Sequence, residues 1–219
     1  MAIRGVLFDV DGTLVNVEER FYHHFNENLK TFGIAPIERG DYEHRRAVGT
    51  LSDLIPSEGD ARANFWLKFL EDFSHSDHTE LGRPFPGALE TLDLLKKRGY
   101  RMAVITGRTS DPARVLEELA LHRLEEYFEF VLTNRNGKNG MNKAENLIKA
   151  CSMIGFTPSE CAYVGDWRGD VESATEAGIG MIIAVLSGGE NRESLEDSNP
   201  HVILKSIADV PAFLATLKE

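Results

Sequence analysis

The chain has 219 residues, of which 42% are hydrophobic and 27% charged, and a formal net charge of −11. This length suits one domain with a large insertion or two small domains, and such a chain can bury a core without disulfide bridges. The acidic balance argues against binding to nucleic acid or an anionic membrane, and the lack of any apolar run of ~18 residues argues against a membrane-spanning helix.

The first predicted element is an apolar strand near the N-terminus that ends in two carboxylates. The apolar run spans residues 3–8, and Asp9 and Asp11 follow it in the stretch D-V-D-G-T-L at 9–14. Two acids at the carboxyl end of a parallel strand are unfavourable unless a cation or a shared proton relieves their repulsion. We therefore predict a metal site that acts on a phosphate, with one acid as nucleophile and the other exchanging protons. Thr13 can hold this turn through its hydroxyl, and the alternative to a site is a solvated acidic turn.

The next segment contains no convincing strand. Between residues 15 and 82, apolar side chains recur at helical spacing, which predicts an all-helical insertion with its own small core. The two stripes are Phe21, Phe25, Leu29 and Phe32, and Phe65, Phe69 and Phe73. We therefore predict a core of residues 1–14 and 83–219 and a helical unit of residues 15–82. In this unit Arg45 or Arg46 is a candidate to pair with a carboxylate or second phosphate of a substrate; a solvated basic helix end is the alternative.

The remainder of the chain alternates apolar runs with helical patterns, which is typical of a parallel α/β sheet. The predicted strands are residues 102–105, 128–132, 161–164 and 179–185, and residues 202–217 are expected to hold a short strand and a closing helix. Gly99 and Gly178 stand where helices are expected to end. Ser187 opens a predicted polar loop of about a dozen residues.

Two of these strands are followed by groups that suit a phosphate or a metal. Thr106 and Gly107 follow one strand, and a hydroxyl with neighbouring backbone N–H groups can hold phosphate oxygens, although a simple turn is the alternative. Asp166 and Asp170 follow the strand at 161–164, and oxygen ligands of this kind suit Mg²⁺. Their alternative role is to cap a helix.

A lysine is a candidate to offset this negative charge. Lys143 begins the predicted helix at 142–150 and could neutralise the nucleophile and grip a phosphate as a point charge. A solvent-exposed helix lysine is the alternative. Lys138 and Lys149 are rivals for the same role.

Taken in order, these motifs resemble the haloacid dehalogenase-like superfamily in its phosphatase branch. They are D-V-D-G-T-L at 9–14, Thr106, Lys143 and G-D-x-x-x-D at 165–170. The resemblance spans essentially the whole chain and is closest to phosphoglycolate phosphatase-like and β-phosphoglucomutase-like members. Many relatives have Pro after the motif lysine, where this chain has Ala144. The resemblance implies a Rossmann-like α/β core with an all-helical cap domain of the first type inserted at 15–82.

The resemblance also implies roles for individual residues. Asp9 would attack phosphorus and become an aspartyl-phosphate, and Asp11 would protonate the leaving alcohol and then activate the water that hydrolyses the intermediate. Mg²⁺ would be held by Asp9, Asp166 and the backbone carbonyl of Asp11. Asp170 would support the metal through water or orient the lysine. The residues implied to bind the transferring phosphoryl group and its charge are Thr106, Gly107 and Lys143.

The leading functional hypothesis is a Mg²⁺-dependent phosphatase of a small phosphorylated metabolite, with phosphoglycolate favoured by the resemblance. A sugar-phosphate mutase, which shares the aspartyl-phosphate, and a non-catalytic binding subunit are the alternatives. Cys151 and Cys161 form neither a metal spacing nor a disulfide framework, so we expect a cytoplasmic protein. The sequence does not distinguish a monomer from a homodimer.

Overall fold

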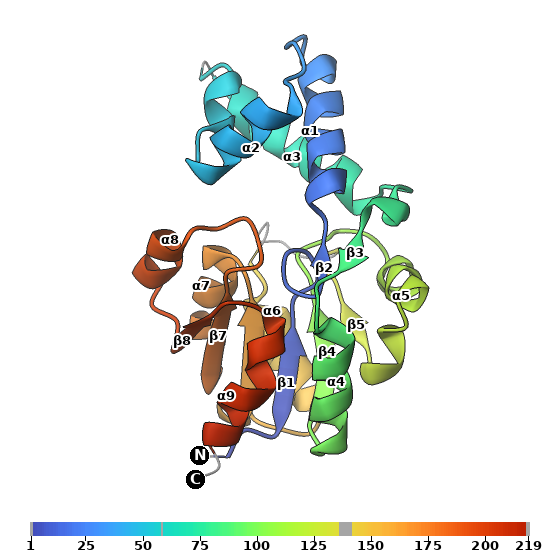
Figure 1. The fold of residues 1–219 in the computed structure, drawn as a ribbon, viewed down its shortest axis with the longest axis vertical. Coiled ribbons are helices and arrows are strands. Elements are labelled where there is room, and N and C mark those ends of the chain that lie inside the picture. Colours follow the sequence, from blue (N-terminus) through green and yellow to red (C-terminus); the bar gives the residue numbers. More distant parts are fainter. Residues whose placement is uncertain (1, 58, 136–141, 218–219) are drawn as a thin grey trace. The chain divides into compact units, whose positions relative to one another are not determined.

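The computed structural model describes residues 2–57, 59–135 and 142–217 (Figure 1). Contacts divide the chain into two compact units. One consists of Met1–Asn16 and Arg83–Glu219, and the other is Val17–Gly82. The boundary after Asn16 lies two residues beyond the predicted one, which was placed after residue 14.

The larger unit is built on a six-stranded sheet in the order β5-β4-β1-β6-β7-β8 (Figure 1). Every neighbouring pair in this sheet is parallel, so the predicted parallel α/β fold is confirmed. The strands are β1 (Gly5–Phe8), β4 (Arg101–Ile105), β5 (Val131–Leu132), β6 (Cys161–Gly165), β7 (Met181–Val185) and β8 (Val202–Leu204).

The central strand β1 marks the point where the strand order changes direction. Phe8, its last residue, lies opposite Val104 of β4 on one side and Val164 of β6 on the other. In an open parallel sheet, a crevice for ligands forms outside the carboxyl ends of the strands at such a point. The residues that follow β1, β4 and β6 therefore emerge next to one another.

Helices surround this sheet and bury its faces. The α-helix α6 contacts β1 and β4, α7 contacts β6 and β7, and α4 packs against α9. Gly99 and Gly178 follow α4 and α7 with φ angles of +81° and +69°, which confirms them as helix ends. The elements are α4 (Ala88–Lys97), α5 (Pro112–Leu121), α6 (Ala144–Met153), α7 (Arg168–Glu176), α8 (Arg192–Asp197), α9 (Val210–Thr216), and the 3₁₀ turns Glu125–Tyr127, Pro158–Glu160 and Ile207–Asp209.

The smaller unit is helical and has an aromatic core. Helices α1 and α3 pack along each other, with ring centroids 4.5 Å apart for Phe21 and Phe69 and 5.5 Å apart for Phe25 and Phe65. The two stripes read from the sequence therefore meet in one core, as their helical spacing indicates. The elements are α1 (Glu18–Thr31), α2 (Arg39–Ala47), α3 (Ala61–Ser74), and the 3₁₀ turns Leu51–Leu54 and Thr79–Leu81.

Two local expectations were wrong. A two-residue strand, β2 (Val15–Asn16), pairs antiparallel with β3 (Arg83–Pro84) where no strand was expected, because two residues are too few to show an alternating pattern. The predicted polar loop after Ser187 contains α8, whose first turn is capped by the Asn191 side chain accepting the Ser194 N–H. Across the described residues, the helices all fall short of the length and apolar character that a membrane crossing requires.

Candidate active site

Asp9 lies directly after β1 and is buried, with 5% of its surface exposed. Its N–H donates to the carbonyl of Val164 at 2.9 Å, which continues the pairing of β1 with β6 for one residue. The chain then turns sharply, because the Val10 carbonyl accepts the N–H of Leu14, and Gly12 has a φ of +86°. This turn brings the chain around the end of β1 and leaves the Asp9 carboxylate at the edge of the sheet.

Lys143 links this carboxylate to the other side of the site. Its Nζ donates to Asp9 Oδ1 at 2.7 Å, to Asp170 Oδ1 at 2.6 Å and to Tyr163 Oη at 3.2 Å. Lys143 is the residue directly before α6, because this helix begins at Ala144, two residues later than the predicted start at residue 142. Lys149 is exposed on the same helix, so it is not the buried lysine of the site. Lys138 lies outside the described residues.

Three buried carboxylates form a cluster at the ends of β1 and β6. Oxygen atoms of Asp9, Asp166 and Asp170 all lie within 4.8 Å of one another. The Thr13 hydroxyl donates to Asp166 Oδ1 at 2.9 Å, so it holds this acid rather than the turn that the sequence suggested. The Tyr163 hydroxyl lies 3.0 Å from Asp170 Oδ1, a contact that sequence reasoning missed because this tyrosine reads as an ordinary strand residue.

The charges in the cluster are unbalanced. Burial raises the pKa of Asp9 to about 7, although Lys143 acts in the opposite direction. Burial and the neighbouring Asp9 and Asp170 also hold the pKa of Asp166 well above its usual range. The pKa of Lys143 is well above its ordinary value despite burial, because Asp170 and Asp9 favour its charged form. Among the described residues, the ammonium of Lys143 therefore faces three carboxylates, and a second cation would relieve their repulsion.

The backbone packs closely around the Asp166 carboxylate and holds it in one position, as suits a metal ligand. A Cβ built on Gly12 would lie 2.2 Å from Asp166 Oδ2, and one built on Gly188 would lie 1.7 Å from it. Ser187, beside Gly188, donates its hydroxyl to the Gly12 carbonyl at 2.9 Å, which joins the two backbone segments. The donor set is oxygen-only and anionic, as Mg²⁺ prefers, so the residues present fit this ion. Sequence reasoning missed Gly188, which it read as the start of a loop.

Thr106 and Gly107 follow β4 at the same edge of the sheet. The Thr106 N–H donates to the Leu132 carbonyl at 3.0 Å, and its hydroxyl accepts the Arg108 N–H at 3.3 Å. Thr106 is 1% exposed, and Gly107 is buried. The structure thus places both residues after the strand next to β1.

Asp11 has a different set of neighbours from Asp9. Both of its carboxylate oxygens accept hydrogen bonds from the guanidinium of Arg108, at 2.5 and 2.7 Å. That arginine also donates to Glu118 of α5. Sequence reasoning gave no role to Arg108 or Glu118. The signal that was available is the arginine directly after the Thr106-Gly107 pair.

The two arginines predicted to meet a substrate lie in the helical unit. Arg45 Nε lies 3.0 Å from both carboxylate oxygens of Asp41, and Arg46 Nε lies 3.0 Å from Glu18 Oε2. Each guanidinium is thus paired with a carboxylate of its own unit. Their contact with a substrate stays a prediction.

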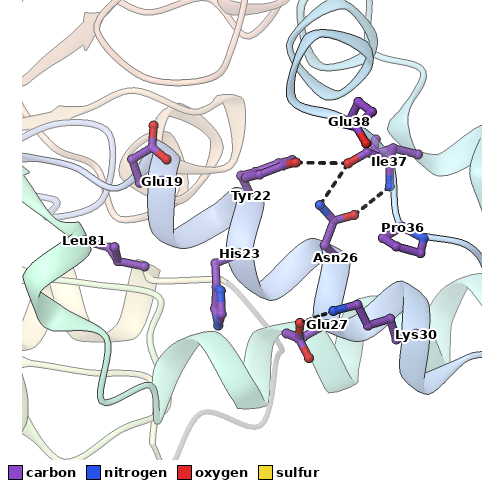
Figure 2. Close-up of a pocket in the computed structure, with 10 residues that line it drawn as sticks. All are labelled: Glu19, Tyr22, His23, Asn26, Glu27, Lys30, Pro36, Ile37, Glu38 and Leu81. Carbon is purple, nitrogen blue, oxygen red and sulfur yellow. Dashed lines mark hydrogen bonds and ion pairs between the residues drawn. The ribbon is translucent and has the colours of Figure 1, made fainter.

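The helical unit contains a pocket of about 430 Å³ beside α1 (Figure 2). The Ile37 carbonyl accepts hydrogen bonds from Tyr22 Oη and Asn26 Nδ2, both at 3.1 Å, and the Ile37 N–H donates to Asn26 Oδ1 at 2.8 Å. These bonds fix the segment before α2 against α1. Figure 2 labels the ten residues that line the pocket, and Arg45 and Arg46 are not among them.

Comparisons with known proteins agree with this architecture. A pyrophosphatase PpaX of Bacillus cereus strain AH820 is 28% identical over 218 residues, which are 99% of each chain. A solved structure described as a predicted phosphatase from Clostridium acetobutylicum has a TM-score of 0.78 at 18% identity and covers 99% of this chain and 100% of that one. Another, described as a predicted phosphoglycolate phosphatase from Haemophilus somnus 129pt, has a TM-score of 0.70 at 20% identity and covers 99% of this chain and 98% of that one.

The two solved structures share the fold with this protein. The match to a family is more specific, because it extends through the ends of β1, β4 and β6, which carry the site. Residues 6–184 match the description of a haloacid dehalogenase-like hydrolase, and the protein belongs to that family.

Proposed function

We propose that this protein is a Mg²⁺-dependent phosphatase that hydrolyses a small phosphorylated metabolite through an aspartyl-phosphate on Asp9. The observation that carries the proposal is the contact of the Asp9 carboxylate with Lys143 inside a cluster of three buried acids. Binding alone does not require a buried acid beside a lysine at the end of a central strand. Phosphoryl transfer does require an in-line nucleophile and neutralisation of the equatorial oxygens.

The proposed reaction has two steps. First, an Asp9 oxygen bonds to phosphorus while the bond from phosphorus to the leaving oxygen breaks, and Asp11 gives that oxygen a proton. Second, water attacks the phosphorus of the aspartyl-phosphate, Asp11 takes the proton, and the Asp9 carboxylate and inorganic phosphate are released. Thr106 and the Gly107 N–H bind the phosphoryl oxygens, and Lys143 offsets their charge.

The ion would be held by Asp9, Asp166 and the Asp11 backbone carbonyl, with Asp170 in support. When bound, Mg²⁺ supplies neutralisation of the phosphoryl charge. Thr13 and the glycine backbone around Asp166 keep that ligand in one position.

Two substrate classes have support. The resemblance of the motifs favours a phosphomonoester such as phosphoglycolate, and the relative named pyrophosphatase, at 28% identity, favours inorganic pyrophosphate. Both are small molecules, which agrees with the net negative charge of the chain, since that charge argues against binding to nucleic acid or an anionic membrane. Cys151 and Cys161 are free and buried, which supports a reducing, cytoplasmic location.

The test is phosphate release with Mg²⁺ from a panel of p-nitrophenyl phosphate, phosphoglycolate, inorganic pyrophosphate and a hexose 1-phosphate. We expect turnover of at least one compound, loss of turnover on chelation, and loss of turnover in Asp9→Asn. Asp197→Asn is the matched control, because Asp197 is an exposed aspartate of the same unit.

Four outcomes would contradict the proposal in different ways. Full activity of Asp9→Asn would show that Asp9 is not the nucleophile. Full activity after chelation would show that the reaction does not require a metal ion. Conversion of the hexose 1-phosphate into an isomer without free phosphate would identify the mutase alternative. A folded, Mg²⁺-binding protein without turnover on the whole panel would favour the non-catalytic subunit.

A further inference from the structure

Asp11 is held by a buried arginine that the mechanism above does not use. Arg108 Nε donates to Asp11 Oδ2 at 2.7 Å and Nη2 donates to Asp11 Oδ1 at 2.5 Å. On its other edge, Nη1 donates to Glu118 Oε2 at 2.5 Å and Nη2 donates to Glu118 Oε1 at 3.3 Å. One planar guanidinium therefore engages two carboxylates at once.

The arginine is fixed by its backbone as well as by its side chain. Its N–H donates to the Thr106 hydroxyl, and its carbonyl accepts the Asn134 N–H at 2.8 Å. Arg108 is 6% exposed and Glu118 is 2% exposed, whereas 21% of the Asp11 side chain is exposed. Solvent therefore does not reach the Glu118 end of this network, whereas it does reach the carboxylate of Asp11.

This arrangement suits a carboxylate that must contact substrate and water in turn. A carboxylate oxygen has more than one acceptor direction, so Asp11 can keep its bonds to Arg108 while a second partner approaches. The two parallel N–H groups fix the plane of the carboxylate, which one ammonium cannot do. Glu118 holds the far edge of the guanidinium and prevents it from turning toward a bound phosphate.

We propose that Arg108 is a positioning residue that orients Asp11 for proton transfer, and that Glu118 anchors Arg108 for this task. The inference rests on the proposed function, because Asp11 needs orientation only if it exchanges protons with a substrate. A purely structural ion pair would stabilise the fold and affect every substrate equally. A positioning pair affects the steps in which Asp11 takes part.

The experiment is a double-mutant cycle on kcat/KM with the panel compound that the wild-type enzyme turns over fastest among those with an alcohol leaving group, namely phosphoglycolate and the hexose 1-phosphate. Arg108→Lys keeps the positive charge but removes the two parallel N–H groups that bind the Asp11 carboxylate. We expect this substitution to lower kcat/KM about 10- to 100-fold, since general acid–base catalysis contributes about 10²- to 10⁴-fold. In an Asp11→Asn background the same substitution should change kcat/KM less than about twofold, because its effect acts through Asp11. If the two residues acted independently, the free-energy effects of the two substitutions would add.

A second readout separates positioning from structure. The leaving group of p-nitrophenyl phosphate departs without a proton, so Arg108→Lys should reduce its kcat/KM much less than that of an alkyl phosphate. Glu118→Gln should give the same pattern with a smaller amplitude. Arg101→Lys is the matched control, because Arg101 makes a similar two-bond pair with Glu129 at the exposed start of β4.

The outcomes distinguish this inference from the function on which it rests. If the wild type turns over no panel compound, the proposed function and the positioning role both fail. If the enzyme is active but the cycle is additive, or if both leaving groups suffer equally, only the role of Arg108 is overturned. Unchanged melting temperatures of the variants exclude a general loss of folding as the cause.

Discussion

The Nζ of Lys143 lies 2.7 Å from Oδ1 of Asp9, across a separation of 134 residues. The same ammonium donates to Asp170 at 2.6 Å, so it joins the end of β1 to the first turn of α7. Both lysine and Asp9 are almost fully buried. The contact therefore stabilises the charge of the proposed nucleophile in a region that water does not screen.

Replacing this lysine should damage both catalysis and stability. Lys143→Met retains much of the side-chain volume but leaves the buried carboxylates without their ammonium. We expect kcat to fall by about 10²- to 10³-fold, as for loss of one charge-stabilising donor. The free energy of unfolding should fall by about 3–5 kcal/mol, as for a broken buried ion pair. Urea unfolding and steady-state kinetics measure the two effects.

Lys149→Ala provides the control for that prediction. Lys149 is exposed on the same helix, so Lys149→Ala should change the free energy of unfolding by less than about 0.5 kcal/mol and should leave kcat unchanged. Equal effects of the two substitutions would contradict a special role for Lys143.

The strand ends of the site could be predicted because each follows a compact apolar run. Asp9, Thr106 and Asp166 come directly after β1, β4 and β6, and these three strands are neighbours in the sheet. A parallel α/β pattern places all such residues at one edge, whatever the strand order. The aromatic stripes of the helical unit were predictable for a similar reason, since their spacing of three to four residues is that of a helix face.

Contacts that depend on tertiary structure could not be predicted from these patterns. Glu118 reads as one of many helix glutamates, and only the structure shows that it is buried against Arg108. Gly188 reads as a loop glycine, because the close approach of its backbone to Asp166 has no local signature. The strand β5 spans only Val131–Leu132 and is shorter than the predicted run at 128–132, although the Glu129 N–H before it already donates to the Met102 carbonyl of β4 at 2.9 Å.

Binding of Mg²⁺ should weaken as the pH falls below 7. The pKa of Asp9 is raised from 3.8 to about 7, so in the metal-free folded protein this carboxyl holds a proton between those values, and Mg²⁺ must displace it. Mg²⁺ affinity should therefore fall by about tenfold for each pH unit below 7 if one proton is displaced. Calorimetric titration with Mg²⁺ across this range measures the slope and the released protons.

The stability of the metal-free protein should follow the opposite trend. Because the folded-state pKa is raised, the contribution of Asp9 to stability is fully present below 3.8 and is lost as the pH rises through about 7. The rise in melting temperature on adding Mg²⁺ should thus be larger at about pH 8 than at about pH 5.5. In Asp9→Asn the side chain at position 9 has no titrating proton for Mg²⁺ to displace. The rise in melting temperature on adding Mg²⁺ should therefore depend less on pH in this variant. An equal Mg²⁺ response at both pH values in the wild type would contradict the prediction.

A side chain at position 188 should disturb the metal ligand beside it. In Gly188→Ala the new Cβ would lie 1.7 Å from Asp166 Oδ2, so the carboxylate or the loop must move. We expect Mg²⁺ affinity to fall by about 10- to 100-fold, as for loss of a group that orients a ligand. Gly40→Ala is the control, because nothing lies within 4 Å of that position and alanine favours the helix. Wild-type Mg²⁺ affinity in Gly188→Ala would show that Asp166 tolerates the crowding.

The two neighbouring arginines of the helical unit should differ in their effect on stability. The Arg46 guanidinium lies 4.6 Å from the ring centroid of Phe21 and also pairs with Glu18, so Arg46→Ala should lower the free energy of unfolding by about 1 kcal/mol. Arg45 pairs with Asp41, which is exposed on the same helix, and Arg45→Ala should lower the free energy of unfolding by less than about 0.5 kcal/mol.

Fluorescence can report these changes for the helical unit alone. The chain has two tryptophans, and Trp66 packs among the aromatic rings of this unit, whereas Trp167 belongs to the α/β unit. In a Trp167→Phe background, urea unfolding followed by Trp66 emission therefore measures the helical unit. The same variants test the predicted substrate contact, because loss of a binding arginine raises KM and leaves kcat unchanged. An arginine whose removal alters neither KM nor kcat acts only within its own unit.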